Sequence, residues 1–73
     1  MDVVQVIGDN VRRLRRERGL TQEQLRDLSG VRQQFISELE SGRSTNPSVR
    51  TIARLCEPLG VALADLVTPS SFR

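Results

Sequence analysis

The sequence predicts a compact all-α domain of five helices. Apolar residues recur three and four positions apart in five successive segments, which is the spacing of one face of a helix. Helix-capping residues or glycine stand at the ends of these segments. No segment alternates apolar and polar residues in the manner of a half-buried strand. These observations favour helices packed around one small core.

The first two helices are defined by their apolar stripes and by their ends. A helix over residues 3–18 ends at Gly19. A second, short helix begins at Thr21, which is followed three residues later by glutamine in the pattern of a capping box. Gly30, in a left-handed conformation, ends this second helix. The residues expected to face the core are Ile7, Val11, Leu14, Leu25 and Leu28.

A third helix is expected over residues 33–41, with Ile36 and Leu39 facing inward and Gly42 at its end. Residues 20–42 thus contain two short helices joined by a tight glycine turn, which forces the helices to cross steeply. This is the geometry of a helix-turn-helix. Its second helix can enter a DNA major groove about 12 Å wide, while its first helix crosses the phosphate backbone.

The last third of the sequence predicts two more helices after a polar loop at residues 43–47. Ser48 caps the fourth helix and Gly60 ends it. The expected apolar residues of the fourth helix are Val49, Ile52, Ala53, Cys56 and Leu59, and those of the short fifth helix are Val61, Leu63, Leu66 and Val67.

Length and composition limit the functions that the chain can have. Its 73 residues suit one domain, residues 1–68, with a short tail at residues 69–73. One core of this size contributes only about 3–5 kcal/mol, so dimerisation or efficient helix packing is expected to help. One cysteine and no histidine predict no disulfide, no metal site and no cofactor. No nucleophile-and-base set can be assembled, so an enzyme is not expected.

Basic residues are concentrated near the start of the chain. The net charge is only +2, but all eleven basic residues are arginines. Arginine holds a phosphate or a guanine edge with paired hydrogen bonds. An equally good alternative is that three of these arginines are ordinary solvent-exposed residues of a helix: Arg12, Arg13 and Arg16. Five arginines lie within seven positions: Arg12, Arg13, Arg15, Arg16 and Arg18.

The outer face of the third helix carries four polar side chains that could read bases: Gln33, Gln34, Ser37 and Glu38. A glutamine amide can pair with both N6 and N7 of adenine. Glu38 could accept a hydrogen bond from cytosine N4, or it could repel phosphate and so exclude wrong registers. On an arbitrary helix these residues would simply be polar surface. Within a helix-turn-helix, base reading is the favoured interpretation.

Other polar residues are placed to contact the DNA backbone. Gln22 lies in the first turn of the second helix, where free N–H groups and the helix dipole favour a phosphate. Gln22 could instead be a solvent-exposed residue that only favours helix formation. Arg43, Ser44 and Asn46 follow the third helix and would meet the backbone on the other side of the groove. Asn46 could equally be an ordinary polar residue of the loop.

Glu40 lies at the edge of the core, where a carboxylate is costly unless it is paired. Arg15 borders the core side of the first helix, so we expect an Arg15–Glu40 ion pair that ties the first helix to the third. Arg15 could also touch a phosphate. Cys56 is interpreted as a core residue, with a redox switch as the alternative. Phe35 could pack at the core edge or meet a thymine methyl group, and Phe72 could pack across a dimer or hang free.

Three segments resemble the phage-repressor family of helix-turn-helix proteins, the Cro/cI or Xre type: LTQEQL at residues 20–25, GV at residues 30–31 and ISELESG at residues 36–42. The likeness covers residues 7–67. It implies a lambda-repressor-like fold of five helices, symmetric dimers on DNA and recognition by the third helix. It places base and phosphate contacts at the polar residues already named, and it implies the Arg15–Glu40 pair. The paired glutamines look like those of certain lambdoid repressors that read adenine-containing half-sites.

Four positions depart from the family pattern. Arg26 stands where the family usually has a small alanine against the recognition helix. Arg32 replaces the usual serine or threonine cap of the third helix, which removes the cap but allows a phosphate contact. Ala62 replaces the usual serine cap of the fifth helix. Pro58 lacks a backbone donor and should bend the fourth helix or end it early.

The sequence therefore predicts a DNA-binding transcription regulator that binds a double-stranded operator as a homodimer. The expected operator is an inverted repeat with half-site centres about 34 Å apart. A small phage-type repressor or a restriction-modification controller protein fits this description. The alternative is an antitoxin or adaptor module whose main partner is another protein. We expect a bacterial or phage protein in the cytoplasm, associated with the nucleoid, with no membrane contact and no small-molecule ligand.

Overall fold

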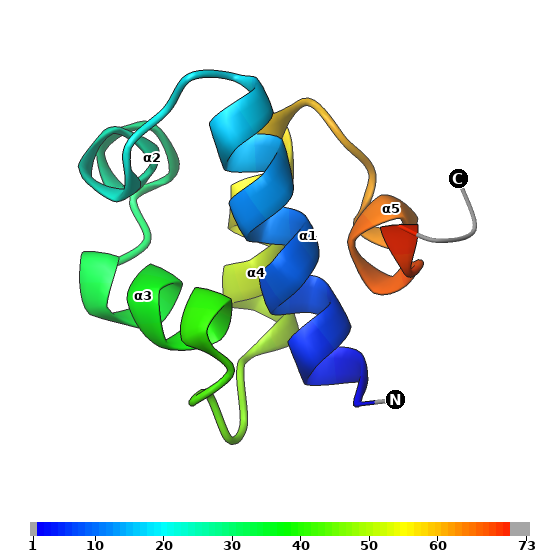
Figure 1. Cartoon of the computed structure of the whole chain (residues 1–73). Coiled ribbons are helices and arrows are strands. Elements are labelled where there is room, and N and C mark those ends of the chain that lie inside the picture. The colour runs from blue at the N-terminus through cyan, green and yellow to red at the C-terminus, as the bar shows by residue number, and fades with distance from the viewer. Residues whose placement is uncertain (1, 71–73) are drawn as a thin grey trace.

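The computed structural model describes residues 2–70, which form five α-helices and no strand (Figure 1). The predicted all-α fold is confirmed. Phe72, for which the sequence leaves two roles open, lies outside the described residues. None of the helices found between residues 2 and 70 is long and apolar enough to cross a membrane. The helices are α1 (Val3–Glu17), α2 (Gln22–Ser29), α3 (Gln33–Ser41), α4 (Val49–Leu59) and α5 (Leu63–Val67).

The predicted helix ends are present. Thr21 and Gln24 form a capping box, in which Thr21 Oγ1 accepts from the Gln24 N–H at 3.0 Å and Gln24 Oε1 accepts from the Thr21 N–H at 2.8 Å. The Ser48 hydroxyl accepts from the Thr51 N–H at the start of α4. Gly30 ends α2 with a φ of 74°, a left-handed conformation that favours glycine. These local signals fix where α2 begins and ends and where α4 begins.

Helix α1 is the central element of the fold. It packs against α3, α4 and α5, while α2 packs against α3 and α4. Figure 1 shows α1 crossing in front of α4, with α2 and α3 on one side and α5 on the other. One core lies between these helices, formed by Ile7, Val11, Leu14, Leu25, Val31, Ile36, Leu39, Ile52, Leu55, Leu59 and Leu66.

Several predicted core positions are wrong. Leu28 is 62% exposed and Val49 is 66% exposed, whereas Leu55, which the sequence pattern does not single out, is fully buried. In α4 the periodicity allows two neighbouring stripes, and the packing against α1 and α2 buries the one that contains Leu55. The other predicted residues that lie at the surface are Ala53, Leu63 and Val67.

Pro58 does not end α4 early, because the helix continues to Leu59 and stops at Gly60. Pro58 lies in the last turn, where its missing N–H removes a single intrahelical hydrogen bond. Ala62 provides no side-chain cap for α5, as expected, but the Asp65 carboxylate accepts from the Ala62 N–H at 2.9 Å. The start of α5 is therefore stabilised from within the helix.

The far end of α5 is held by Asn10, a buried residue of α1 that no sequence pattern singles out. Its Nδ2 donates to the carbonyl oxygens of Leu66 and Thr68, both at 2.8 Å. The last carbonyl groups of a helix have no partner within the helix. Asn10 therefore satisfies two such groups and fixes α5 against α1.

Helices α1 and α3 approach so closely at Gly8 that no side chain fits between them. A Cβ atom at this position would overlap the Leu39 carbonyl oxygen and lie 2.9 Å from the Leu39 carbonyl carbon. These atoms belong to the backbone of α3 and cannot rotate away. Glycine is therefore required at position 8 by the packing of the helices rather than by its own backbone conformation.

Gly8→Ala should lower the free energy of unfolding by about 1–3 kcal/mol, because the methyl group must push α1 and α3 apart. The intrinsic helix propensity of alanine acts in the opposite direction by about 1 kcal/mol, so a net loss measures the packing conflict. Urea unfolding followed by circular dichroism checks this. The neighbouring exposed substitution Asp9→Ala is the control and should change stability by less than about 0.5 kcal/mol. An unchanged or raised midpoint for Gly8→Ala would contradict the close approach.

Candidate nucleic-acid interface

The turn between α2 and α3 places α3 at the surface with one face outward. Gly30 reverses the chain, and Val31 is buried in the core with only 2% of its surface exposed. Ile36 and Leu39 of α3 are fully buried, as predicted. Because both the turn and the inner face are anchored, α3 has a fixed orientation relative to the rest of the domain.

The outer face of α3 carries the four predicted base-reading residues at different degrees of exposure. Gln34 is exposed, while Gln33, Ser37 and Glu38 are half-buried. Gln33, Ser37 and Ser41 follow one another at four-residue intervals, so they lie along one line of the helix surface. Gln33 accepts a hydrogen bond on Oε1 from Arg26 Nη1 of α2 at 3.2 Å.

Arg15 and Glu40 form a buried, bidentate ion pair between α1 and α3. Arg15 Nε donates to Glu40 Oε2 at 2.8 Å, and Arg15 Nη2 donates to Glu40 Oε1 at 2.9 Å. Arg15 Nη1 also donates to the Leu20 carbonyl oxygen at 2.8 Å, just before α2. The hydrogen bond to Glu40 raises the pKa of the Arg15 guanidinium, against the lowering effect of burial. Arg15 therefore stays positively charged beside Glu40.

Gln22 is also tied to this pair. Its Nε2 donates to Glu40 Oε1 at 3.2 Å, and the side chain is half-buried rather than fully in solvent. This contact is not among those expected from the sequence. One carboxylate thus joins α1, the start of α2 and the inner edge of α3.

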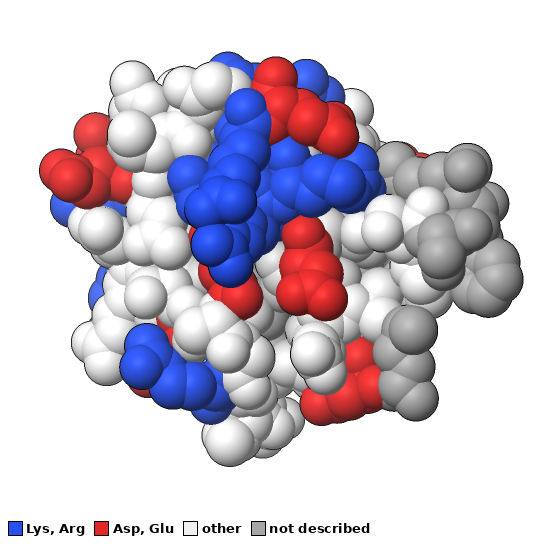
Figure 2. All heavy atoms as spheres, in the orientation of Figure 1, with Lys and Arg blue, Asp and Glu red and all other residues white. Residues whose placement is uncertain are grey.

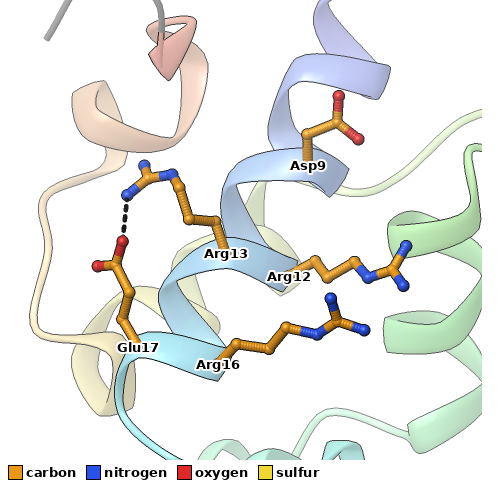
Figure 3. Close-up of a pocket in the computed structure, with 5 residues that line it drawn as sticks. All are labelled: Asp9, Arg12, Arg13, Arg16 and Glu17. Carbon is orange, nitrogen blue, oxygen red and sulfur yellow. Dashed lines mark hydrogen bonds and ion pairs between the residues drawn. The ribbon is translucent and has the colours of Figure 1, made fainter.

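A shallow hollow of about 240 Å³ opens above the Arg15–Glu40 pair. Arg12 and Arg16 of α1 line one side of the hollow, and Ser37 of α3 lines the other side. Figure 3 shows Arg12 and Arg16 extending side by side from α1 toward the neighbouring helix. The guanidinium group of neither arginine has a hydrogen-bond or ion-pair partner within residues 2–70. The complete lining is Arg12, Arg15, Arg16, Gln22, Ser37, Glu40 and Ser41.

Arg13 differs from its two neighbours. It turns to the opposite side of α1, where Nη1 donates to Glu17 Oε2 at 3.1 Å (Figure 3). Its Nη2 donates to Asn10 Oδ1 at 3.3 Å. The structure therefore separates three arginines that the sequence treats alike. Figure 2 shows that the arginines of α1 form a continuous basic patch on this face of the molecule, with acidic side chains at its edges.

The predicted phosphate-binding residues beside α3 lie at both of its ends. Arg32 is exposed at the N-cap and makes no capping hydrogen bond. Arg43 and Ser44 follow Gly42, and their backbone N–H groups both donate to the Glu38 carbonyl oxygen. The side chains of Arg43 and Asn46 are exposed, whereas Ser44 is half-buried. Basic or polar groups therefore flank the outer face of α3 at its start and at its end.

Two further residues are placed by the structure. Phe35 is partly buried and packs against the core, which agrees with the packing interpretation. Cys56 also packs at the edge of the core. Burial, and then the negative charge of Asp65, raise the pKa of the Cys56 thiol. A raised pKa reduces the reactive thiolate, which favours a packing role over a redox role.

Comparison with known proteins gives consistent results. Residues 11–66 match the sequence model of a helix-turn-helix family. The chain is 50% identical over 70 residues to a protein of Sinorhizobium fredii named as an uncharacterized HTH-type transcriptional regulator, covering 96% of this chain and 90% of that protein. It is 31% identical to the control protein C.SmaI of Serratia marcescens, over 93% of this chain and 80% of that protein. The crystal structure of the clp gene regulator ClgR from C. glutamicum superposes with a TM-score of 0.80 at 31% identity, covering 92% of this chain and 85% of that one.

Arg15→Ala should lower the free energy of unfolding by about 3 kcal/mol, because it leaves the buried Glu40 carboxylate without its cation. This loss is at the lower end of the range for breaking a buried ion pair, because Gln22 still donates a hydrogen bond to the Glu40 carboxylate. Chemical denaturation provides the measurement. Arg12→Ala removes an exposed arginine from the same helix and should change stability by no more than about 0.5 kcal/mol. Equal losses in the two variants would refute a stabilising role for the ion pair.

Proposed function

Because this chain belongs to the helix-turn-helix family of the Cro/cI (Xre) type, we propose that it binds a specific DNA operator as a homodimer and so regulates transcription. The observation that carries the proposal is the division of α3 into two faces. Ile36 and Leu39 are fully buried, while the opposite face presents amide, hydroxyl and carboxylate groups. A helix held in this way can lie in a major groove and offer those groups to base edges.

Gln34 is the most accessible candidate for base reading, since it is the exposed member of the four polar residues. Its amide can both donate and accept, which matches the N7 and N6 groups of adenine. Ser37 and Glu38 lie one turn further along the helix and would meet the neighbouring base pairs. Together with Gln33 they would read a short half-site.

The DNA backbone would pass over the hollow beside α3. The side chains of Arg12 and Arg16 have no bonding partner among the described residues. Gln22 lies at the start of α2, where the helix dipole favours an anion. Phosphate groups could therefore be held from α1 and from α2 at once. The backbone on the other side of the groove would meet Arg32, Arg43, Ser44 and Asn46.

A homodimer would place two copies of α3 in successive major grooves on one side of the DNA. The operator would then be an inverted repeat with half-site centres about 34 Å apart. The similarity to the control protein C.SmaI supports a controller or a small repressor as the biological role. The names of these relatives favour DNA as the partner over the alternative of an antitoxin or adaptor.

Gln34→Ala should weaken binding to the best operator, selected from a random DNA pool, by about 1–3 kcal/mol and relax the preference at one base pair. The effect is specific because the amide contacts a base edge rather than a phosphate. Competition binding with operators changed one base pair at a time measures it. Gln5→Ala removes an exposed glutamine from the first turn of α1 and should change neither affinity nor preference. If Gln34→Ala behaves like Gln5→Ala, the assignment of Gln34 to base reading fails.

Arg12→Ala and Arg16→Ala should each weaken binding about equally to all DNA sequences. Each variant should also reduce the steepness of log K against log salt by about 2, because each of the two protomers in a dimer would bind one phosphate fewer. Titrations at several salt concentrations measure the slope. Arg54→Ala, an exposed arginine on α4 beside the end of α2, is the control and should leave the slope unchanged. A wild-type affinity that hardly depends on salt would instead support the adaptor alternative.

A further inference from the structure

The side chain of Arg26 reaches from α2 to the first residue of α3. Its Nη1 donates to Gln33 Oε1 at 3.2 Å, and its Nε donates to Asp27 Oδ1 at 3.0 Å. Asp27 thus restrains the guanidinium on one side while Gln33 is bonded on the other. Residues 26 and 33 are separated by the turn at Gly30, so the contact depends on the crossing of the two helices.

The chemistry of arginine fixes which end of the Gln33 amide faces α2. A guanidinium only donates hydrogen bonds, so the group that faces it must be the carbonyl oxygen Oε1 and not the NH2 group. The NH2 group of Gln33 therefore points away from Arg26. Gln33 is half-buried, which limits the other orientations that the amide can adopt.

This orientation changes the base that Gln33 can read. Pairing with adenine requires the amide to present its oxygen to N6 and its NH2 group to N7 side by side. With the oxygen held toward α2, the amide offers chiefly its two N–H donors to the groove. Guanine presents two acceptors there, N7 and O6, whereas the adenine N6 group is a donor and would oppose another donor.

We propose that Arg26 is a specificity-determining residue that positions Gln33 to read guanine instead of adenine. Arg26 touches no base in this arrangement and acts only through the Gln33 amide. The inference rests on the proposed function, because it requires α3 to lie in a major groove. It differs from the sequence-based interpretation, in which the glutamine amides suit the N6 and N7 groups of adenine.

Selection from a random DNA pool tests the proposal with four full-length proteins: the wild type, Gln33→Ala, Arg26→Met and Arg32→Met. The base pair that Gln33 reads is the one whose preference is relaxed by Gln33→Ala. Methionine keeps much of the length of Arg26 and forms helices well, but it cannot donate to Gln33. Arg32→Met removes a neighbouring exposed arginine with the same loss of charge and serves as the control. Circular dichroism of each variant verifies the fold.

The wild type should prefer guanine over adenine at the Gln33 position by about fivefold or more, and Arg26→Met should abolish or reverse this preference. Arg32→Met should weaken binding to all sequences alike and retain the preference. Adenine at this position in the wild type would overturn the proposal. A guanine preference in Arg26→Met within about twofold of that of the wild type, or no position relaxed by Gln33→Ala, would also overturn it. Failure of the proposed function itself would appear differently, as a wild-type protein that enriches no sequence at all.

Discussion

The orientation of α3 depends on how tightly it is joined to α1. The two backbones meet at Gly8, where a Cβ atom would overlap the Leu39 carbonyl group. Two turns further along α1, Arg15 bonds to Glu40 through two parallel hydrogen bonds. Both contacts act on the same end of α3, and the buried Val31 anchors the turn at its other end. A helix restrained at both ends loses little further freedom on binding, which favours accurate contact with a partner.

The Arg15–Glu40 pair also determines the electrostatics of the surface above it. Glu40 lies at the floor of the hollow that Arg12 and Arg16 border, and an unpaired carboxylate there would repel a phosphate. Arg15 neutralises that charge within the fold, and Gln22 donates to the same carboxylate. The two exposed arginines of α1 therefore remain available to an anion. The structural ion pair and the candidate phosphate contacts thus depend on one another through a single carboxylate.

Features encoded by neighbouring residues could be predicted from the sequence, whereas most features that depend on packing between helices could not. The Arg15–Glu40 pair is the exception, because a carboxylate at the core edge needs a cation beside it. The capping box at Thr21 and the helix end at Gly30 need only local chemistry, and both are present. The assignment of Leu28 to the core is wrong because a short helix has apolar residues on two neighbouring faces, and its partner helices decide which one is covered. Asn10 and Gly8 carry no local signal, since their roles depend on carbonyl groups more than 30 residues away along the chain, such as those of Leu39 and Leu66.

The same limit applies to the candidate site, and the arginines of α1 and of its C-cap, Arg18, show why. They stand within seven positions and have the same chemistry, but each successive residue is rotated by about 100° around the helix and meets a different neighbour. Arg15 faces a buried carboxylate, Arg13 bonds to Glu17 and Asn10, and Arg18 donates to the Leu59 carbonyl oxygen at the end of α4. Only Arg12 and Arg16 point toward α3 without a partner among the described residues (Figure 3). A net charge of +2 therefore understates the capacity of this face to bind an anion, because Glu17 and Glu40 beside these arginines are already paired and only Asp9 among the acidic residues lining the patch is not in an ion pair within the described range.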